Sequence, residues 1–242
     1  MKLFEPDIFS NSTNLFLESC LPEAEFILRE YYGLKIVGPL MQSGGFEANS
    51  NNYRIPTNHG DVLLKRNWRT PEIFELQLQI CDRLRVSGIE MPEIIKAQNG
   101  RYLVNIDGTL WCVSEFLDGH YFTGARDETE RLLSFIIRLF ETLEFYEEPD
   151  LPIIEFIDKG VLPILEQYGD SYLVEILEAV LSHASDWNKI GVTHIDLHPR
   201  NILIHSGQPY IIDFDSICLQ SPEVSSSFAI VKLMRQYIVK NG

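Results

Sequence analysis

The chain has 242 residues, of which 45% are hydrophobic and 23% are charged, and its formal net charge is −15 at pH 7. This is the composition of an ordinary globular protein, and the length allows one large domain or two lobes. The negative charge argues against nucleic acid or an anionic membrane as the main partner, and cationic or neutral partners fit better.

The cysteines and the N-terminus bear on the cellular location. Four cysteines are far apart in the sequence and lack the spacing of a metal site, so we expect free thiols in a reducing compartment (Cys20, Cys81, Cys112 and Cys218). The first residues contain charges and a proline where a signal peptide needs an apolar core, and no apolar run approaches the roughly 20 residues of a membrane span. The expected location is the cytoplasm; the oligomeric state stays open.

The first half of the chain predicts a small antiparallel sheet. Residues 21–32 are expected to form a short helix that ends at Gly33. Short apolar or alternating segments then follow, separated by turn signals such as Asp107-Gly108. We expect strands over residues 34–41, 51–55, 61–66, 101–106 and 109–116.

One helix interrupts this sheet. Thr70 is a good N-cap, Pro71 suits the first helical position, and Glu72 favours the positive end of the helix dipole. Apolar residues then recur on one face as far as Ser87-Gly88 (Ile73, Leu76, Ile80 and Leu84).

The second half is expected to be mainly helical. One apolar stripe is formed by Leu132, Ile136, Leu139 and Leu143, and another by Leu173, Ile176, Val180 and Ala184. A hairpin is expected to join residues 202–204 to 210–212, and a last helix is expected over 228–239.

The segment from Gly191 to Asp215 is the most informative one. Asp196 lies in a loop before the expected hairpin, Asn201 follows five residues later, and Asp213 ends the second strand. A kinase-type phosphoryl-transfer site needs a base and oxygen ligands for magnesium in this order. We therefore expect Asp196 to be the base, and Asn201 and Asp213 to bind the metal. Because neighbouring carboxylates repel one another, nucleotide and Mg²⁺ are expected to bind together.

Two other interpretations of these residues stay open. An Asp before a turn and an Asn at a strand start are common loop formers, so each residue taken alone could be structural. A metal hydrolase could instead use His194, Asp196 and His198 as alternating ligands. That arrangement would leave Asn201 and Asp213 without a role, and the turn at His198-Pro199 would break the alternation.

Candidate nucleotide-binding residues lie in the first half. The loop around Gly44 and Gly45 could bring backbone N–H groups close to phosphates. Lys65 ends an apolar strand, so its ammonium group could reach a phosphate, and Glu75 on the following helix could form an ion pair with it. Glu72 is the competing partner for Lys65.

With these residues in place, residues 34–216 resemble the aminoglycoside phosphotransferase and choline kinase-like family. The catalytic loop of that family commonly reads HGDLHPGN and its metal motif IDFD, and this chain has His194-Ile195-Asp196-Leu197-His198-Pro199-Arg200-Asn201 and Ile212-Asp213-Phe214-Asp215. The resemblance implies an α+β, protein-kinase-like two-lobed fold. An N-terminal lobe (residues 1–117) with an antiparallel sheet plus one helix would bind the nucleotide, and a mainly helical C-terminal lobe (residues 118–242) would contain the catalytic loop and the metal motif.

The resemblance also implies roles for individual residues and a reaction. Asp196 would be the catalytic base and Lys65 the phosphate-binding lysine, with Glu75 as its partner. The hinge beside the adenine of ATP would be formed by Ser114, Glu115, Phe116 and Leu117. The expected enzyme is an ATP- and Mg²⁺-dependent phosphotransferase that acts on a hydroxyl of an aminoglycoside, amino sugar, choline-like compound or related metabolite. The alternative is a catalytically silent module that binds a nucleotide or a partner.

Some features depart from the family pattern. Ile195 and Arg200 replace glycines that are usual in the loop, and only 27 residues follow Asp215. Acceptor recognition would then depend on residues 118–190, a partner subunit or further sequence. Residues 118–190 contain 16 acidic and 5 basic side chains. An acidic pocket for a cationic acceptor and ordinary solvated helix faces both explain this excess.

Overall fold

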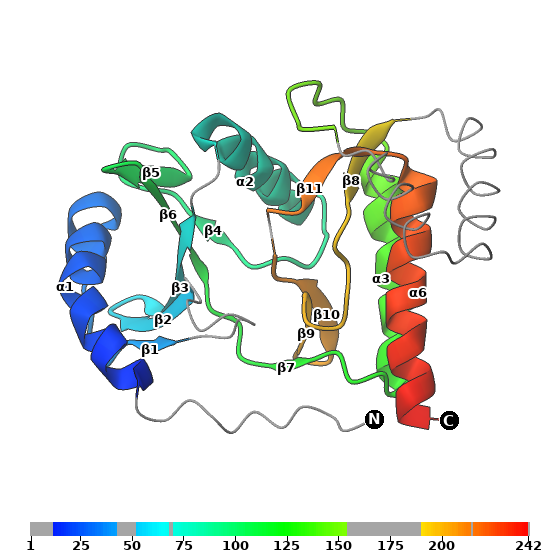
Figure 1. The fold of residues 1–242 in the computed structure, drawn as a ribbon, viewed down its shortest axis with the longest axis horizontal. Coiled ribbons are helices and arrows are strands. Elements are labelled where there is room, and N and C mark those ends of the chain that lie inside the picture. The colour runs from blue at the N-terminus through cyan, green and yellow to red at the C-terminus, as the bar shows by residue number, and fades with distance from the viewer. Residues whose placement is uncertain (1–11, 43–51, 68–69, 154–189, 214, 242) are drawn as a thin grey trace, which may run out of the picture. The chain divides into compact units, whose positions relative to one another are not determined.

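The computed structural model describes residues 12–42, 52–67, 70–153, 190–213 and 215–241. The chain divides into two compact units (Figure 1). The first contains Met1–Asp82 and Pro92–Leu117, and the second contains Arg83–Met91 and Asp118–Gly242. Among the described helices, none has both the length and the apolar character needed to cross a bilayer.

The first unit contains a six-stranded antiparallel sheet with the strand order β1-β2-β3-β6-β4, in which β5 also pairs with β6. Its strands are β1 (Met41–Gln42), β2 (Asn52–Thr57), β3 (Gly60–Asn67), β4 (Ile94–Ile95), β5 (Leu103–Ile106) and β6 (Thr109–Glu115). Four of the expected strands are confirmed as β2, β3, β5 and β6, with ends shifted by one or two residues.

The strand expected over residues 34–41 is wrong. Only β1 and an isolated bridge between Ile36 and Thr57 form in this region. Pro39 has no N–H group to donate to a neighbouring strand, and Gly38 beside it weakens strand pairing further. The segment is therefore held by single contacts, such as the bond from Val37 N to Pro56 O at 2.9 Å.

Two helices belong to this part of the chain. α1 (Ser12–Tyr32) confirms the helix expected over residues 21–32 but begins earlier, and it ends at Gly33, whose φ is +69°. There Leu34 N donates to Leu28 O at 2.8 Å, as is common where glycine ends a helix. α2 (Pro71–Val86) has the start and the end that the sequence predicts.

The alternation of β3 explains where Lys65 lies. Val62 and Leu64 are buried in a core with Ile27 and Leu28 of α1, where burial of each such side chain contributes about 1.5–3 kcal/mol. Because side chains alternate along a strand, Lys65 lies on the opposite face of the sheet.

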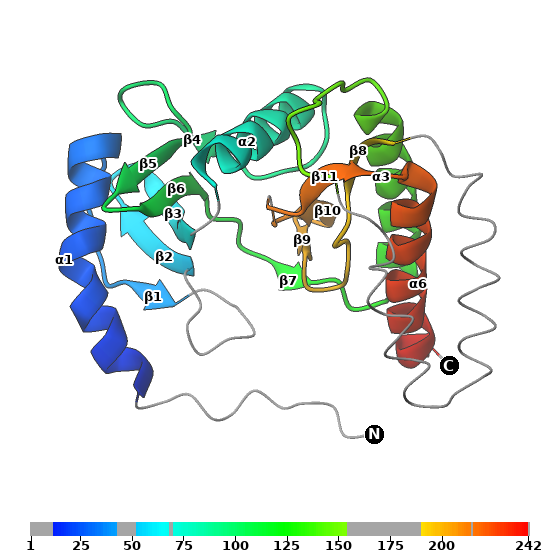
Figure 2. The same ribbon diagram turned by 45° about the horizontal axis from the view of Figure 1, so that its top comes forward.

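The second unit contains α3 (Arg126–Leu143), α6 (Pro222–Asn241) and five short strands among its described residues. The strands β7 (His120–Tyr121), β9 (Ile202–His205) and β10 (Gln208–Ile211) form one sheet, and β8 (Gly191–His194) pairs with β11 (Ile217–Gln220). α3 and α6 lie side by side (Figures 1 and 2).

The expectations for this half are largely confirmed. The apolar stripe of α3 is buried (Leu132, Ile136, Leu139 and Leu143), and β9 and β10 form the expected hairpin. The last helix is also present but begins at Pro222 rather than at residue 228. The second expected stripe, from Leu173 to Ala184, lies outside the described residues.

Three cysteines are free and buried, as expected: Cys81, Cys112 and Cys218. Burial raises the pKa of the Cys218 thiol to about 12, so this group stays protonated at neutral pH. The side chain of Cys20 lies outside the described set.

α6 is fixed to the rest of its unit at both ends. Near its N-terminus, the buried Ser225 donates through Oγ to His194 O at 2.8 Å. In its C-terminal half, Gln236 Nε2 donates to Thr123 O at 3.3 Å, and Asn241 Nδ2 donates to Gly124 O at 2.7 Å. The backbone of α6 is therefore held both to the end of β8 and to the segment that precedes α3.

Gly124→Ala is expected to lower the free energy of unfolding by about 2–3 kcal/mol. Gly124 has a φ of +83°, and a Cβ atom there would lie 2.6 Å from Gln236 O, in the backbone of α6. Urea denaturation measures the effect. Gly207→Ala is the control, because Gly207 has a similar φ of +77° but open space around it, and its cost should be only about 1 kcal/mol. Equal losses in the two variants would contradict close packing at Gly124.

Candidate functional site

The candidate site begins at the end of β8. This strand pairs antiparallel with β11, with His194 opposite Ile217, and Ile195 N donates to Ser216 O at 3.2 Å. The chain then forms the loop of residues 195–201 and continues into β9. The loop that contains Asp196 is thus held against the segment that follows Asp213.

His194 links the segment of Asp196 to the segment of Asp213. Its ring is buried, and its Nε2 lies 2.8 Å from Asp213 O, while Nδ1 accepts the Asp196 N–H at 3.3 Å. Because Nδ1 accepts, the proton is on Nε2, which donates to the carbonyl. Burial lowers the pKa of His194 and outweighs the opposing effect of Asp213, so the ring stays neutral.

The side chains of Asp196, Asn201 and Asp213 converge. Asn201 Nδ2 donates to Asp196 O at 2.9 Å and lies 3.4 Å from Asp213 Oδ2 and 3.5 Å from Asp196 Oδ2. The position of Asn201 is fixed by the backbone, because Ile212 N donates to Asn201 O at 3.2 Å. The structure therefore brings together the three residues that the sequence selects as base and metal ligands.

Two further side chains contact the Asp196 carboxylate. His198 Nε2 lies 3.4 Å from Oδ2, and Lys232 Nζ lies 2.9 Å from Oδ1. Lys232 comes from α6 and is not among the residues that the sequence analysis selects. Lys232 lies three and seven residues after the buried Ala229 and Ser225 and so shares their helix face.

The hydrolase interpretation with three alternating ligands is wrong. Both ring nitrogens of His194 are used in hydrogen bonds. In the part of the chain that the structure describes, no group of three or more His, Cys, Asp or Glu residues is placed to hold a metal ion. Asn201 and Asp213 alone do fit magnesium, since both offer hard oxygen atoms and Mg²⁺ in kinases takes its other ligands from phosphates and water.

Lys65 and Glu75 belong to the first unit. Lys65 lies opposite Cys112 on β6, and two residues along the strands Leu63 lies opposite Ser114. Because side chains two residues apart point to the same face, Lys65 and Ser114 share one face of the sheet. Glu75 Oε1 accepts the Tyr102 N–H at 3.1 Å, and its Oε2 is buried with no hydrogen-bond partner in the described residues. The Lys65–Glu75 ion pair stays a prediction, and Glu72 is exposed in the first turn of α2.

The expected hinge uses two of its backbone donors within the sheet. Glu115 N donates to Glu93 O at 2.8 Å, and Phe116 N donates to Asp61 O at 3.1 Å. These two N–H groups are therefore not available to a nucleotide base in this structure. Gly44 and Gly45, the expected phosphate loop, lie outside the described residues.

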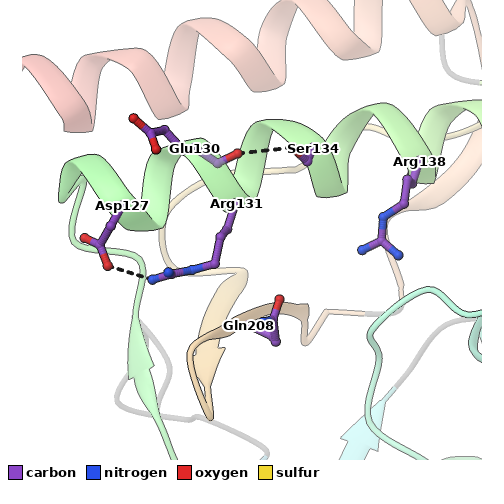
Figure 3. Close-up of a pocket in the computed structure, with 6 residues that line it drawn as sticks. All are labelled: Asp127, Glu130, Arg131, Ser134, Arg138 and Gln208. Carbon is purple, nitrogen blue, oxygen red and sulfur yellow. Dashed lines mark hydrogen bonds and ion pairs between the residues drawn. The ribbon is translucent and has the colours of Figure 1, made fainter.

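A separate pocket of about 340 Å³ lies beside α3 in the second unit. Figure 3 shows Arg131 and Arg138 extending from α3 on the side of Gln208. Arg131 forms an ion pair with Asp127 at 2.7 Å. None of the predicted site residues lines this pocket, so it is distinct from the cluster of Asp196, Asn201 and Asp213.

Solved structures of low sequence identity share the fold. An amicoumacin kinase, hAmiN, in complex with AMP-PNP, Ca²⁺ and Ami, has a TM-score of 0.64 and 17% identity, with coverage of 96% of this chain and 77% of that chain. A microcompartment-associated aminopropanol kinase has a TM-score of 0.62 and 16% identity, with coverage of 92% and 81%. The spectinomycin phosphotransferase APH(9)-Ia, in complex with ADP and spectinomycin, has a TM-score of 0.58 and 17% identity, with coverage of 91% and 79%.

These likenesses confirm the predicted α+β, protein-kinase-like fold. A search of functionally curated proteins gives no sequence match. The model of the phosphotransferase enzyme family matches residues 44–224, which is well over half of the chain and includes every residue predicted for the site. The predicted enzyme class, an ATP-dependent phosphotransferase with an alcohol group as acceptor, is thereby confirmed at the level of the family. The chain belongs to the phosphotransferase enzyme family.

Proposed function

We propose that this chain transfers the γ-phosphate of ATP to a hydroxyl group of a small molecule, with Asp196 as the catalytic base. The observation that supports this most strongly is the convergence of Asp196, Asn201 and Asp213, joined by the contacts of Asn201 Nδ2 at 2.9 to 3.5 Å. Phosphoryl transfer asks the protein mainly to position groups and to stabilise charge, and this set provides both.

Asp196 orients the acceptor hydroxyl and accepts its proton. Its side chain is 42% exposed, so a substrate from solution can reach it. The backbone N–H of Asp196 is held by His194, and its backbone carbonyl is held by Asn201. The carboxylate is thus placed by groups on both sides of the loop, as a general base requires.

Asn201 and Asp213 are the proposed metal ligands. Bound Mg²⁺ would neutralise charge on the β- and γ-phosphates during transfer. In the first unit, we propose that Lys65 binds the phosphates, that Glu75 orients Lys65, and that residues 114–117 receive the base. Gly44 and Gly45 would complete the phosphate-binding loop. We place this activity in the cytoplasm, because buried free thiols suit a reducing compartment.

Two observations support a class of acceptor: the small molecules for which structurally similar proteins are named, and the acidic character of residues 118–190. The amicoumacin kinase, aminopropanol kinase and spectinomycin phosphotransferase are named for small molecules. We propose that the acceptor is likewise an aminoglycoside, amino alcohol, choline-like compound or related metabolite. The acidic excess over residues 118–190 is compatible with a positively charged acceptor.

A second candidate function is a silent nucleotide-binding module. The observation that favours it is the ammonium group of Lys232 at 2.9 Å from Asp196 Oδ1, where it could compete with an acceptor hydroxyl. The full set of predicted catalytic residues favours the enzyme, because a silent module has no chemical need for all of them.

A panel of acceptors separates these functions. ADP release is measured with 1-amino-2-propanol, spectinomycin, choline and kanamycin, and ³¹P NMR identifies the phosphorylated product. Acceptor-dependent ADP release supports the proposed kinase. Tight binding of MgATP without turnover of any acceptor would support the silent module, and failure to bind the nucleotide would contradict both.

Removal of magnesium is expected to weaken ATP binding by about tenfold or more, because the phosphates then face Asp213 without a cation. Isothermal titration calorimetry with ATP in Mg²⁺ and in EDTA measures this difference. In Asp213→Asn the difference should shrink, since the variant lacks the carboxylate ligand. Undiminished ATP affinity of the wild type in EDTA would contradict the metal assignment.

A further inference from the structure

The two oxygen atoms of the Asp196 carboxylate differ in their contacts, because Lys232 of α6 binds one of them. Lys232 Nζ donates to Oδ1 at 2.9 Å, which is the length of a charge-assisted hydrogen bond. Among the residues that the structure describes, Oδ2 has longer contacts, at 3.4 Å to His198 Nε2 and 3.5 Å to Asn201 Nδ2. One oxygen is therefore firmly bound within the protein, while the other keeps its capacity to accept a strong hydrogen bond.

Lys232 is presented by a rigid part of the unit. It shares the inner face of α6 with Ser225 and Ala229, which are both 2% exposed, and Leu233 beside it is 4% exposed. Ser225 binds the carbonyl of His194, two residues before Asp196. The backbone of α6 is thus attached to the strand that leads into the catalytic loop. From this backbone position the Lys232 ammonium group reaches Asp196 Oδ1 at 2.9 Å.

The contact is poorly explained by folding stability alone. The side chains of Lys232 and Asp196 are 35% and 42% exposed, and ion pairs with this much solvent contact contribute little to stability. A lysine on the inner face of a helix also gives up solvation that an apolar residue there would not lose. A role in placing the carboxylate accounts for both observations.

We propose that Lys232 is a positioning residue for phosphoryl transfer, which holds Asp196 through Oδ1 so that Oδ2 receives the acceptor hydroxyl. This inference rests on the proposed function of Asp196 as the base. The terminal torsion angle of an aspartate is broad, so the carboxylate needs an external contact to keep one orientation. A base must lie within hydrogen-bond reach of the proton that it accepts, and a small misplacement is costly.

Steady-state kinetics of the whole chain tests the role of Lys232. Lys232→Met should lower kcat with the best acceptor of the panel by about 10- to 100-fold, while the KM values for ATP and acceptor change little. Lys232→Arg should recover much of kcat, because a guanidinium can also bind Oδ1. Lys240→Met is the matched control, since Lys240 is an exposed lysine in the last turn of α6 and should leave kcat unchanged.

Each of three kinetic results would overturn the inference, and each for a different reason. An unchanged kcat in Lys232→Met would show that the contact is not needed. A higher kcat would show that Lys232 blocks the base. A loss confined to thermal stability, with kcat retained at low temperature, would show a purely structural ion pair.

Crystal structures of the wild type, Lys232→Met and Lys240→Met provide a readout that does not depend on turnover. The Asp196 carboxylate should have one orientation in the wild type and Lys240→Met, and a changed or mixed orientation in Lys232→Met. The same single orientation in all three would overturn the positioning role. If the wild type phosphorylates no acceptor, the proposed function fails, while this comparison still decides whether Lys232 orients Asp196.

Discussion

Asp196→Asn is expected to lower kcat for phosphate transfer by about 10²- to 10⁴-fold, while the affinity for MgATP stays close to that of the wild type. Asparagine has nearly the shape of aspartate, so the contacts with Asn201 and the loop backbone are kept. What is lost is the negative charge and the ability to take a proton from the acceptor hydroxyl. The expected loss therefore falls on the chemical step rather than on nucleotide binding.

Steady-state kinetics with the best acceptor, together with calorimetry for MgATP, measures both quantities. Asp150→Asn is a suitable control, because Asp150 is an exposed carboxylate of the same unit and does not belong to the cluster of Asp196, Asn201 and Asp213. Its kcat should equal that of the wild type. If Asp196→Asn turns over acceptor at the wild-type rate, Asp196 is not the base.

His194→Phe is expected to lower the free energy of unfolding by about 3–5 kcal/mol and kcat on the order of 100-fold. The His194 side chain is buried and binds Asp213 O and the Asp196 N–H. Phenylalanine has no polar atoms, so it leaves both backbone groups without their partner and adds volume to a packed site. The segments that contain the proposed base Asp196 and the proposed metal ligand Asp213 would then lose their shared hydrogen-bond partner.

Urea denaturation and kinetics below the unfolding transition measure the two effects separately. His205→Phe is the control, because His205 is only partly buried and its hydrogen-bond contacts, with Asp118 O at 2.6 Å and Ser206 Oγ at 3.4 Å, do not involve the candidate site residues. It should cost about 1 kcal/mol and leave kcat unchanged. Equal stability losses in the two variants would contradict a larger stabilising role for the two backbone contacts of His194.

The grouping of the candidate site could be predicted because it is local in the sequence. Asp196 and Asn201 lie in one loop, and Asp213 lies two residues after the hairpin that follows it. The turn of this hairpin, Ser206-Gly207, has positive φ at both residues. Such a short connection leaves few ways to place the three side chains. Their chemical roles stay predictions.

Lys232 could not be predicted because its contact depends on tertiary packing. It lies 36 residues after Asp196, on a helix whose direction relative to the loop is set by the bond from Ser225 to His194 and by packing at Gly124. A helical pattern shows which residues share a face but not what that face meets. The pairing of β8 with β11 was missed for the same reason, since neither strand is part of a hairpin.

The start of α6 was missed although its signal is present. Ser221 precedes Pro222 and Glu223, in the same order as Thr70, Pro71 and Glu72 before α2. Val224 N donates to Ser221 Oγ at 3.4 Å, as expected for an N-cap. The run Ser225-Ser226-Ser227 resembles a loop, but the Ser225 hydroxyl binds His194 O and is compatible with the helix.

The polar contacts around Asp196 join residues that are at most 36 positions apart and that belong to the second unit. Short sequence separations make such a cluster quick to assemble during folding, with little entropy lost in loop closure. Lys65, Glu75 and the expected hinge are encoded separately, in the first unit, whereas the proposed metal ligands Asn201 and Asp213 belong to the second. The mutual arrangement of Asp196, Asn201 and Asp213 therefore depends on contacts within the second unit.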